Sequence, residues 1–78
     1  MPIRNPTLGS VLAKLRRSAG LSQEEMAHRA GIHRTYVSEI ERGLKSPTVK
    51  SLMKLAKALD TTSSEIMRQV EAARRPRH

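Results

Sequence analysis

Residues 22–43 read SQEEMAHRAGIHRTYVSEIERG, and this segment divides into two short helices around a tight turn. Ser22 and Glu25 have the spacing of a capping box, in which the serine hydroxyl accepts from the Glu25 amide and the carboxylate accepts from the Ser22 amide. Gly31 marks the turn, and the apolar side chain of Ile32, which follows it, is expected to cover the core at that point. Two helices of roughly eight or nine residues joined by about three residues must cross steeply, so the second helix projects from the body of the protein.

Apolar residues at helical spacing predict three further helices. The first spans about residues 7–18, is ended by Gly20, and presents an apolar stripe made of Leu8, Leu12, Leu15 and Ala19. Another begins at a Thr48 cap, and its inward face consists of Val49, Leu52, Leu55, Ala56 and Leu59. A second capping box, from Thr62 to Glu65, opens a last helix whose stripe consists of Ile66, Val70 and Ala73, with Met67 beside it.

The composition fits a small all-α protein. Its 78 residues allow one hydrophobic core, and a single tyrosine is the only aromatic residue, so the core must come from aliphatic side chains and methionine. The chain has no cysteine, no apolar run of about 18–20 residues and no apolar signal core at its N-terminus. We therefore expect a cytoplasmic, compact five-helix bundle at 7–72, between a flexible N-terminal arm at 1–6 and a basic C-terminal tail at 73–78.

The charge balance predicts an anionic partner. Fifteen Lys and Arg residues against seven Asp and Glu residues give a net charge of +8, as in many nucleic-acid-binding domains. Part of this excess lies in the flanking segments, in Arg4, Arg74, Arg75 and Arg77. A nonspecific RNA binder or a membrane-surface binder that acts through these tails would have a similar charge.

The second helix of the 22–43 segment, over about residues 33–41, has the pattern of a reading helix. Val37 and Ile40 face inward, and the opposite side is short and polar. A projecting helix of this kind fits the major groove of B-DNA, which is about 12 Å wide. Arg34 lies near the N-terminal end, where recognition helices reach base edges. It is the best candidate for a bidentate hydrogen-bonded contact to a guanine.

Residues 8–70 resemble the phage-repressor and Cro-like (Xre-type) helix-turn-helix family. The resemblance is carried by SQEEMA, by Gly31 followed by Ile32, and by YVSEIERG. It implies a lambda-repressor-like bundle in which the second and third helices form the helix-turn-helix. The run HRTYVSEIERG also resembles the controller proteins of restriction-modification systems, which are compact dimers of similar length.

The resemblance also implies a role for each matching residue. The positions that contact bases are Arg34, Thr35, Ser38 and Glu39. The positions that contact phosphates or the edge of the site are Gln23, His33, Tyr36, Arg42 and Lys45. The pair Arg16 and Glu41 matches a structural ion bridge between the first and third helices. Because a carboxylate faces DNA awkwardly, Glu39 either accepts from a cytosine amino group or orients Arg34 or Arg42.

These features predict a small homodimeric transcription regulator that binds a two-fold symmetric operator in double-stranded DNA. Met67 and Val70 are the candidates for the dimer interface, and two recognition helices would read half-sites about 34 Å apart or a multiple of that. The alternative is an antitoxin-like or scaffold protein whose DNA binding is subordinate to a protein partner on the last helix. Deleting residues 73–78 distinguishes these from a protein that binds through its tails. The regulator would keep its sequence preference with modestly weaker affinity, whereas tail-mediated binding would be abolished.

Other functions are not supported by the pattern. The pairs of His28 with Glu24 or Glu25, and of His33 with Glu41, lack a third metal ligand. The chain shows no nucleophile beside a base and no glycine-rich phosphate loop, and it has no room for a ligand-sensing domain. We therefore expect no enzymatic activity, no metal, no cofactor, no small-molecule ligand domain and no membrane association.

Overall fold

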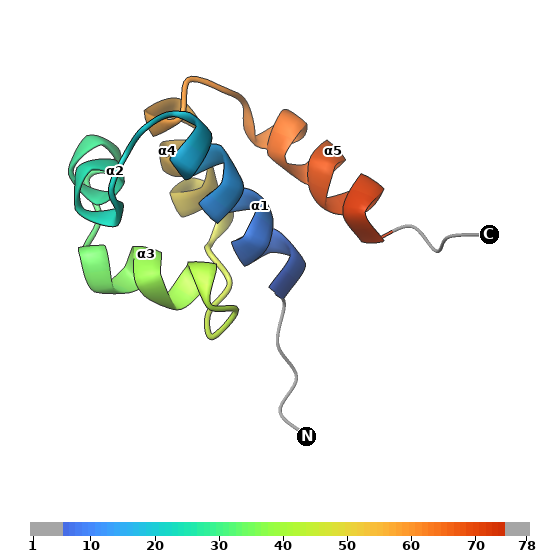
Figure 1. The fold of residues 1–78 in the computed structure, drawn as a ribbon, viewed down its shortest axis with the longest axis horizontal. Coiled ribbons are helices and arrows are strands. Elements are labelled where there is room, and N and C mark those ends of the chain that lie inside the picture. The colour runs from blue at the N-terminus through green and yellow to red at the C-terminus, as the bar shows by residue number, and fades with distance from the viewer. Residues whose placement is uncertain (1–5, 75–78) are drawn as a thin grey trace.

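The computed structural model describes residues 6–74, and their regular structure is five helices (Figure 1). These are α1 (Pro6–Ser18), α2 (Gln23–Ala30), α3 (Arg34–Glu41), α4 (Val49–Ala58) and α5 (Ser63–Arg74). The expected all-α five-helix fold is confirmed. The proposed arm lies outside the described residues except for Pro6, which begins α1. Helix α5 extends to Arg74, two residues into the proposed tail, and 75–78 lie outside the described residues.

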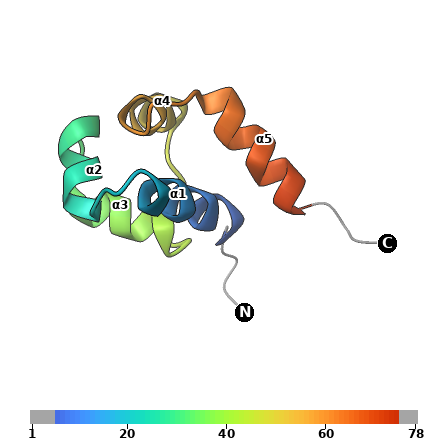
Figure 2. The ribbon, with the colours of Figure 1, turned by 45° about the horizontal axis from the view of Figure 1, so that its top comes forward.

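The bundle is joined mainly through α1 and α2, and α4 also contacts α5. Helix α1 packs against α3 and α5, while α2 packs against α3 and α4, so α1 and α2 hold the other three helices together (Figures 1 and 2). The side chains that are almost fully covered come from all five helices and are Leu12, Met26, Val37, Ile40, Leu55, Ile66 and Val70. No helix in the described part of the chain is long and apolar enough to cross a bilayer.

The turn between α2 and α3 has the expected local structure. The Ser22 hydroxyl accepts from the Glu25 amide at 3.0 Å, and the Glu25 carboxylate accepts from the Ser22 amide at 2.9 Å, which completes the capping box. The Ser22 amide, and then the Ser22 hydroxyl, lower the pKa of Glu25, because they stabilise its charged carboxylate. Gly31 ends α2 in the left-handed conformation, at φ 69°, which glycine adopts without a steric cost. The Ile32 amide then donates to the Ala27 carbonyl at 3.0 Å and closes the turn.

Four details differ from the sequence-based expectation. Ala19, placed on the apolar stripe of the first helix, is exposed just past the end of α1. Val49 is 75% exposed, because at 100° per residue it lies at the edge of the α4 stripe rather than at its centre. Ala73 is exposed in the last turn of α5. The second capping box is only half formed: the Thr62 hydroxyl accepts from the Glu65 amide at 3.1 Å, but the Glu65 carboxylate bonds with Arg68 and Gln69 instead. A guanidinium is the stronger donor, and it competes with the backbone for that carboxylate.

Candidate nucleic-acid interface

Helix α3 exposes one polar face and buries the other. Val37 and Ile40 anchor it in the core, and α1 and α2 are its packing neighbours. On the outer face Arg34 and Thr35 are exposed, and Ser38 and Glu39 are partly exposed. The four residues predicted to contact bases therefore lie together on an accessible ridge. Every one of them carries a hydrogen-bonding group that can reach beyond the surface of the helix.

A charged network fixes the C-terminal end of α3 to α1 and α2. The Glu41 carboxylate accepts from Arg16 Nε at 2.7 Å and from Arg16 Nη2 at 3.1 Å, which is a two-pronged contact. Arg16 Nη1 also donates to the Leu21 carbonyl at 2.8 Å. Only 12% and 6% of the Arg16 and Glu41 side chains are exposed. The hydrogen bond with Glu41 raises the pKa of Arg16, and burial opposes it only in part.

Gln23 contributes to this network. Its side-chain nitrogen Nε2 donates to Glu41 Oε1 at 3.0 Å, so the first residue of α2 contacts the last residue of α3. The resemblance placed Gln23 at a phosphate, and this bond leaves one of its two amide N–H groups for such a contact. Helices α1, α2 and α3 are thus joined at one carboxylate, which restricts how α3 can tilt.

Gly9 allows α1 to approach the end of α3 closely. A Cβ atom built on Gly9 would collide with the main-chain carbonyl groups of Ile40 and Glu41. This glycine was not among the residues predicted from the sequence to matter. A glycine inside a helical pattern was the available signal, because it costs about 1 kcal/mol relative to alanine and needs a packing reason.

The residues expected near phosphates surround the α3 ridge. His33 precedes the helix as its N-cap residue and is exposed, and Tyr36 packs partly against the core. Arg42 is exposed, and its Nε donates to the Ser38 carbonyl at 3.4 Å. Lys45 Nζ lies 3.5 Å from Glu39 Oε1. From the sequence, Glu39 was expected to orient Arg34 or Arg42 if it did not contact a cytosine, whereas the ion pair in the structure is with Lys45.

Of the two residues predicted at a dimer interface, only one is accessible. Val70 is 2% exposed and belongs to the core, so it cannot cover a second copy while the bundle is folded. Met67 is 39% exposed. The two residues are three positions apart on α5, and the apolar stripe alone did not reveal that one is buried in the core and the other is not.

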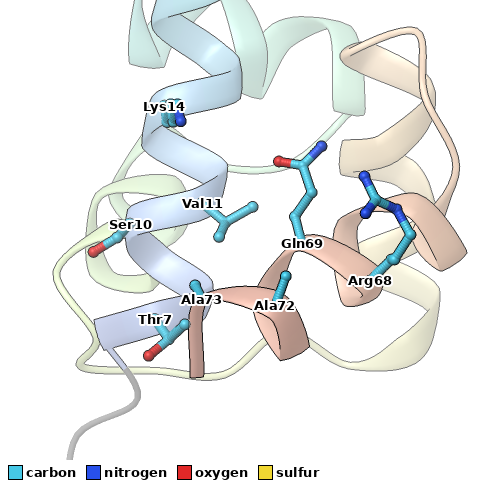
Figure 3. Close-up of a pocket in the computed structure, with 8 residues that line it drawn as sticks. All are labelled: Thr7, Ser10, Val11, Lys14, Arg68, Gln69, Ala72 and Ala73. Carbon is cyan, nitrogen blue, oxygen red and sulfur yellow. The ribbon is translucent and has the colours of Figure 1, made fainter. Parts of the chain in front are cut away.

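On another side of the molecule, α1 and α5 flank an open groove of about 580 Å³ (Figure 3). Its lining is made of small, apolar or cationic side chains and one amide: Thr7, Ser10, Val11, Lys14, Arg68, Gln69, Ala72 and Ala73. None of these residues is a carboxylate, thiol or imidazole, so the groove carries no acid-base pair. Within residues 6–74 no group of three or more His, Cys, Asp or Glu residues is placed to hold a metal ion.

Comparison with known proteins agrees with this geometry, since the helix-turn-helix family model matches residues 12–66, from α1 into α5. The chain belongs to the helix-turn-helix family. Such proteins are DNA-binding transcription regulators, and the resemblance to the Xre type that the sequence motifs indicated is confirmed.

Named relatives of this helix-turn-helix protein point the same way. An uncharacterized HTH-type transcriptional regulator of Sinorhizobium fredii, y4dJ, is 45% identical over 60 residues, which cover 77% of this chain and 78% of the relative. Another, Rv0474 of Mycobacterium tuberculosis, is 37% identical over 59 residues, covering 76% of this chain but only 41% of the relative. These relatives are regulators rather than enzymes, in agreement with the sequence analysis.

A solved structure extends the comparison to three dimensions. The restriction-modification controller protein C.AhdI from Aeromonas hydrophila has a TM-score of 0.78 to this helix-turn-helix protein at 39% identity. The match covers 80% of this chain and 94% of the controller protein. The similarity to controller proteins that the HRTYVSEIERG run indicated therefore extends to most of the fold.

Proposed function

We propose that this protein is a homodimeric transcription regulator that acts in the cytoplasm and reads double-stranded DNA by placing α3 in the major groove. The observation that carries the proposal is the outer face of α3, where Arg34, Thr35 and Ser38 are polar and not covered by another helix. An α-helix with its side chains is about 10–12 Å across, which matches the width of the major groove.

Base contacts come from the α3 ridge. The guanidinium of Arg34 donates to O6 and N7 of a guanine, and the hydroxyl groups of Thr35 and Ser38 contact neighbouring base edges. The phosphates are held by residues around the ridge, namely Gln23, His33, Tyr36, Arg42 and Lys45. In this division the phosphate contacts set the register of the protein on the duplex, and α3 supplies the sequence preference.

Glu39 changes partner when DNA binds. In the free protein Lys45 Nζ lies 3.5 Å from the Glu39 carboxylate. Near the duplex Lys45 moves to a phosphate, and Glu39 becomes free to accept from the amino group of a cytosine.

Two copies of the chain read a two-fold symmetric operator. One α3 of eight residues reaches only a few base pairs, so specific binding needs a second half-site about 34 Å away or a multiple of that. Met67, the accessible member of the predicted pair on α5, is the residue we assign to the contact between copies. Val70 supports the same helix from inside the core.

Selection of binding sites from random duplex tests the proposal. We expect an enriched sequence with two-fold symmetry and, on that site, a loss of about 1–3 kcal/mol for Arg34→Ala, with relaxed preference at one base pair per half-site. Lys45→Ala should weaken cognate and random DNA alike and make the salt dependence shallower. Lys14→Ala, on the exposed side of α1, is the control. An equal loss for Arg34→Ala on random and cognate DNA would contradict base reading by α3.

A further inference from the structure

Helix α4 presents a second exposed surface, the α4 face, which consists of Val49, Lys50, Met53, Lys54 and Lys57. All five side chains are exposed. At 100° per residue they occupy an arc of about 140°, roughly opposite to the stripe that α4 buries in the core. The face is apolar along one edge and cationic over the rest, because Val49 and Met53 lie one turn apart beside the three lysines.

The two apolar residues of the α4 face are unusually accessible. Val49 is 75% exposed and Met53 is 57% exposed, more than the other large hydrophobic residues in the described part of the chain, Leu44 and Met67. Single exposed apolar residues are common on soluble proteins, but a pair one turn apart on a packed helix forms a continuous apolar strip. Covering such a strip with a partner removes apolar surface from water and therefore lowers the free energy.

The charge of the α4 face is uniformly positive. Helix α4 contains no Asp or Glu, and its lysines take part in none of the ion pairs found among residues 6–74. Arg29 of α2 extends the positive surface across an open hollow of about 610 Å³, lined also by Lys54 and Lys57, with Asp60 as its one carboxylate. The occupant of this surface must therefore supply negative charge.

Three kinds of occupant fit this surface poorly. A DNA backbone would pair with the lysines but would leave Val49 and Met53 in water. A second copy would set the lysines of one α4 face against those of the other. An anionic bilayer needs a larger apolar area than two side chains on a helix whose opposite side is buried in the core. The remaining fit is a protein segment with apolar and acidic residues on adjoining faces.

We propose that the α4 face docks an acidic amphipathic helix of a partner protein. Apolar residues of that helix cover Val49 and Met53, and its carboxylates pair with Lys50, Lys54 and Lys57. Helix α4 lies away from α3 in Figures 1 and 2, so the partner binds without covering the α3 ridge. The proposal goes beyond DNA reading and does not depend on it.

Peptide selection on the full chain tests the docking surface. The protein is immobilised and used to select binders from a displayed library of random peptides. Each peptide has about 16 residues, enough for roughly four helical turns. We expect enrichment of peptides in which Asp or Glu alternates with aliphatic residues at helical spacing. A labelled synthetic copy of the enriched peptide should bind at least about tenfold more weakly to a Val49→Asp, Met53→Asp double variant, since both anchors then repel it.

Ala19→Asp is the matched control, because it places the same charge on an exposed apolar residue just after α1, outside the α4 face and outside the residues assigned to DNA or to the second copy. It should bind the peptide like the unmodified protein, and thermal unfolding should show that all variants remain folded. Enriched peptides that lack acidic residues, or that bind the double variant equally well, would overturn the proposal. Three effects of the double substitution would also overturn the proposal. These are dissociation of a dimer, a loss of DNA affinity as large as the loss of peptide affinity, and loss of binding to phosphatidylserine vesicles.

The outcome is separable from that of the DNA-binding proposal. DNA affinity is measured on the same double variant, whose substitutions lie outside the α3 ridge and outside the residues assigned to phosphates. Retained DNA binding together with lost peptide binding supports two independent surfaces. Peptide binding at the α4 face by a protein that prefers no DNA sequence would support the docking surface and refute the DNA reading.

Discussion

The α3 end of the molecule and the α5 end each contain a short ion pair between an arginine and a glutamate. Arg16 and Glu41 are 2.7 Å apart at their closest atoms, and Arg68 and Glu65 are 2.6 Å apart. The first pair joins α1 to α3 across 25 positions of sequence, and both of its side chains are largely covered. The second pair lies within one turn of α5, where 67% and 38% of the two side chains are exposed.

Similar distances therefore do not imply similar contributions to stability. An exposed pair exchanges water contacts for a weak, screened attraction, whereas a covered pair that loses one partner leaves an uncompensated charge away from water. The Glu41 carboxylate also accepts from Gln23, so three helices depend on it. The covered pair therefore joins α3 to α1 and α2, whereas the exposed pair lies within α5 and joins it to no other helix.

Glu41→Ala should give the largest loss. It removes the acceptor for Arg16 and Gln23 together, and we expect the free energy of unfolding to fall by about 2–4 kcal/mol. Urea unfolding followed by circular dichroism measures the change. Arg68→Ala, which breaks the exposed pair, is the matched control and should shift the midpoint only slightly. Equal shifts for the two variants would show that coverage of the pair does not matter.

Gly9→Ala should have the next largest effect, because its methyl group meets main-chain atoms that cannot rotate away. The Ile40 and Glu41 carbonyls belong to α3, so α1 and α3 must separate, at a cost of about 1–3 kcal/mol. Ser10→Ala, at the adjacent exposed position of α1, serves as control. Thermal unfolding of both variants gives the comparison. A Gly9→Ala protein as stable as the control would show that the contact between the two helices is loose.

Glu41 and Gly9 also show what the sequence does and does not reveal about the structure. Capping boxes, apolar spacing and Gly31 predicted the helices correctly, because those signals act within a few residues of each other. The close approach at Gly9, the burial of Val70 and the choice of Lys45 as partner of Glu39 depend on which elements meet in space. The family resemblance indicated that Arg16 and Glu41 form an ion pair, but it did not include the third partner of that carboxylate, Gln23.

The caps of α2 and α5 extend the comparison of the two ends. At α2 the Ser22 hydroxyl and the Glu25 carboxylate both bond to the backbone, whereas at α5 only the Thr62 hydroxyl does so. Ser22→Ala should cost about 1 kcal/mol and Thr62→Ala roughly half of that. Urea unfolding measures both. The order would be reversed if α5 depended on its N-terminal cap more than the helix that supports α3.

The smallest effect is a pH dependence at the α5 end. Arg68, and then Gln69, lower the pKa of Glu65 from its ordinary value of 4.5 to about 2. A carboxylate with a lowered pKa binds fewer protons when folded, so its contribution to stability is complete above about pH 4.5 and disappears as the pH falls through about 2. The difference in melting temperature between the unmodified protein and Glu65→Gln should shrink over that window. In an Arg68→Ala background the same substitution should show a much weaker pH dependence, because the main cause of the lowered pKa is gone. A difference that stays constant from pH 5 to about 2 would mean that water separates the pair in solution.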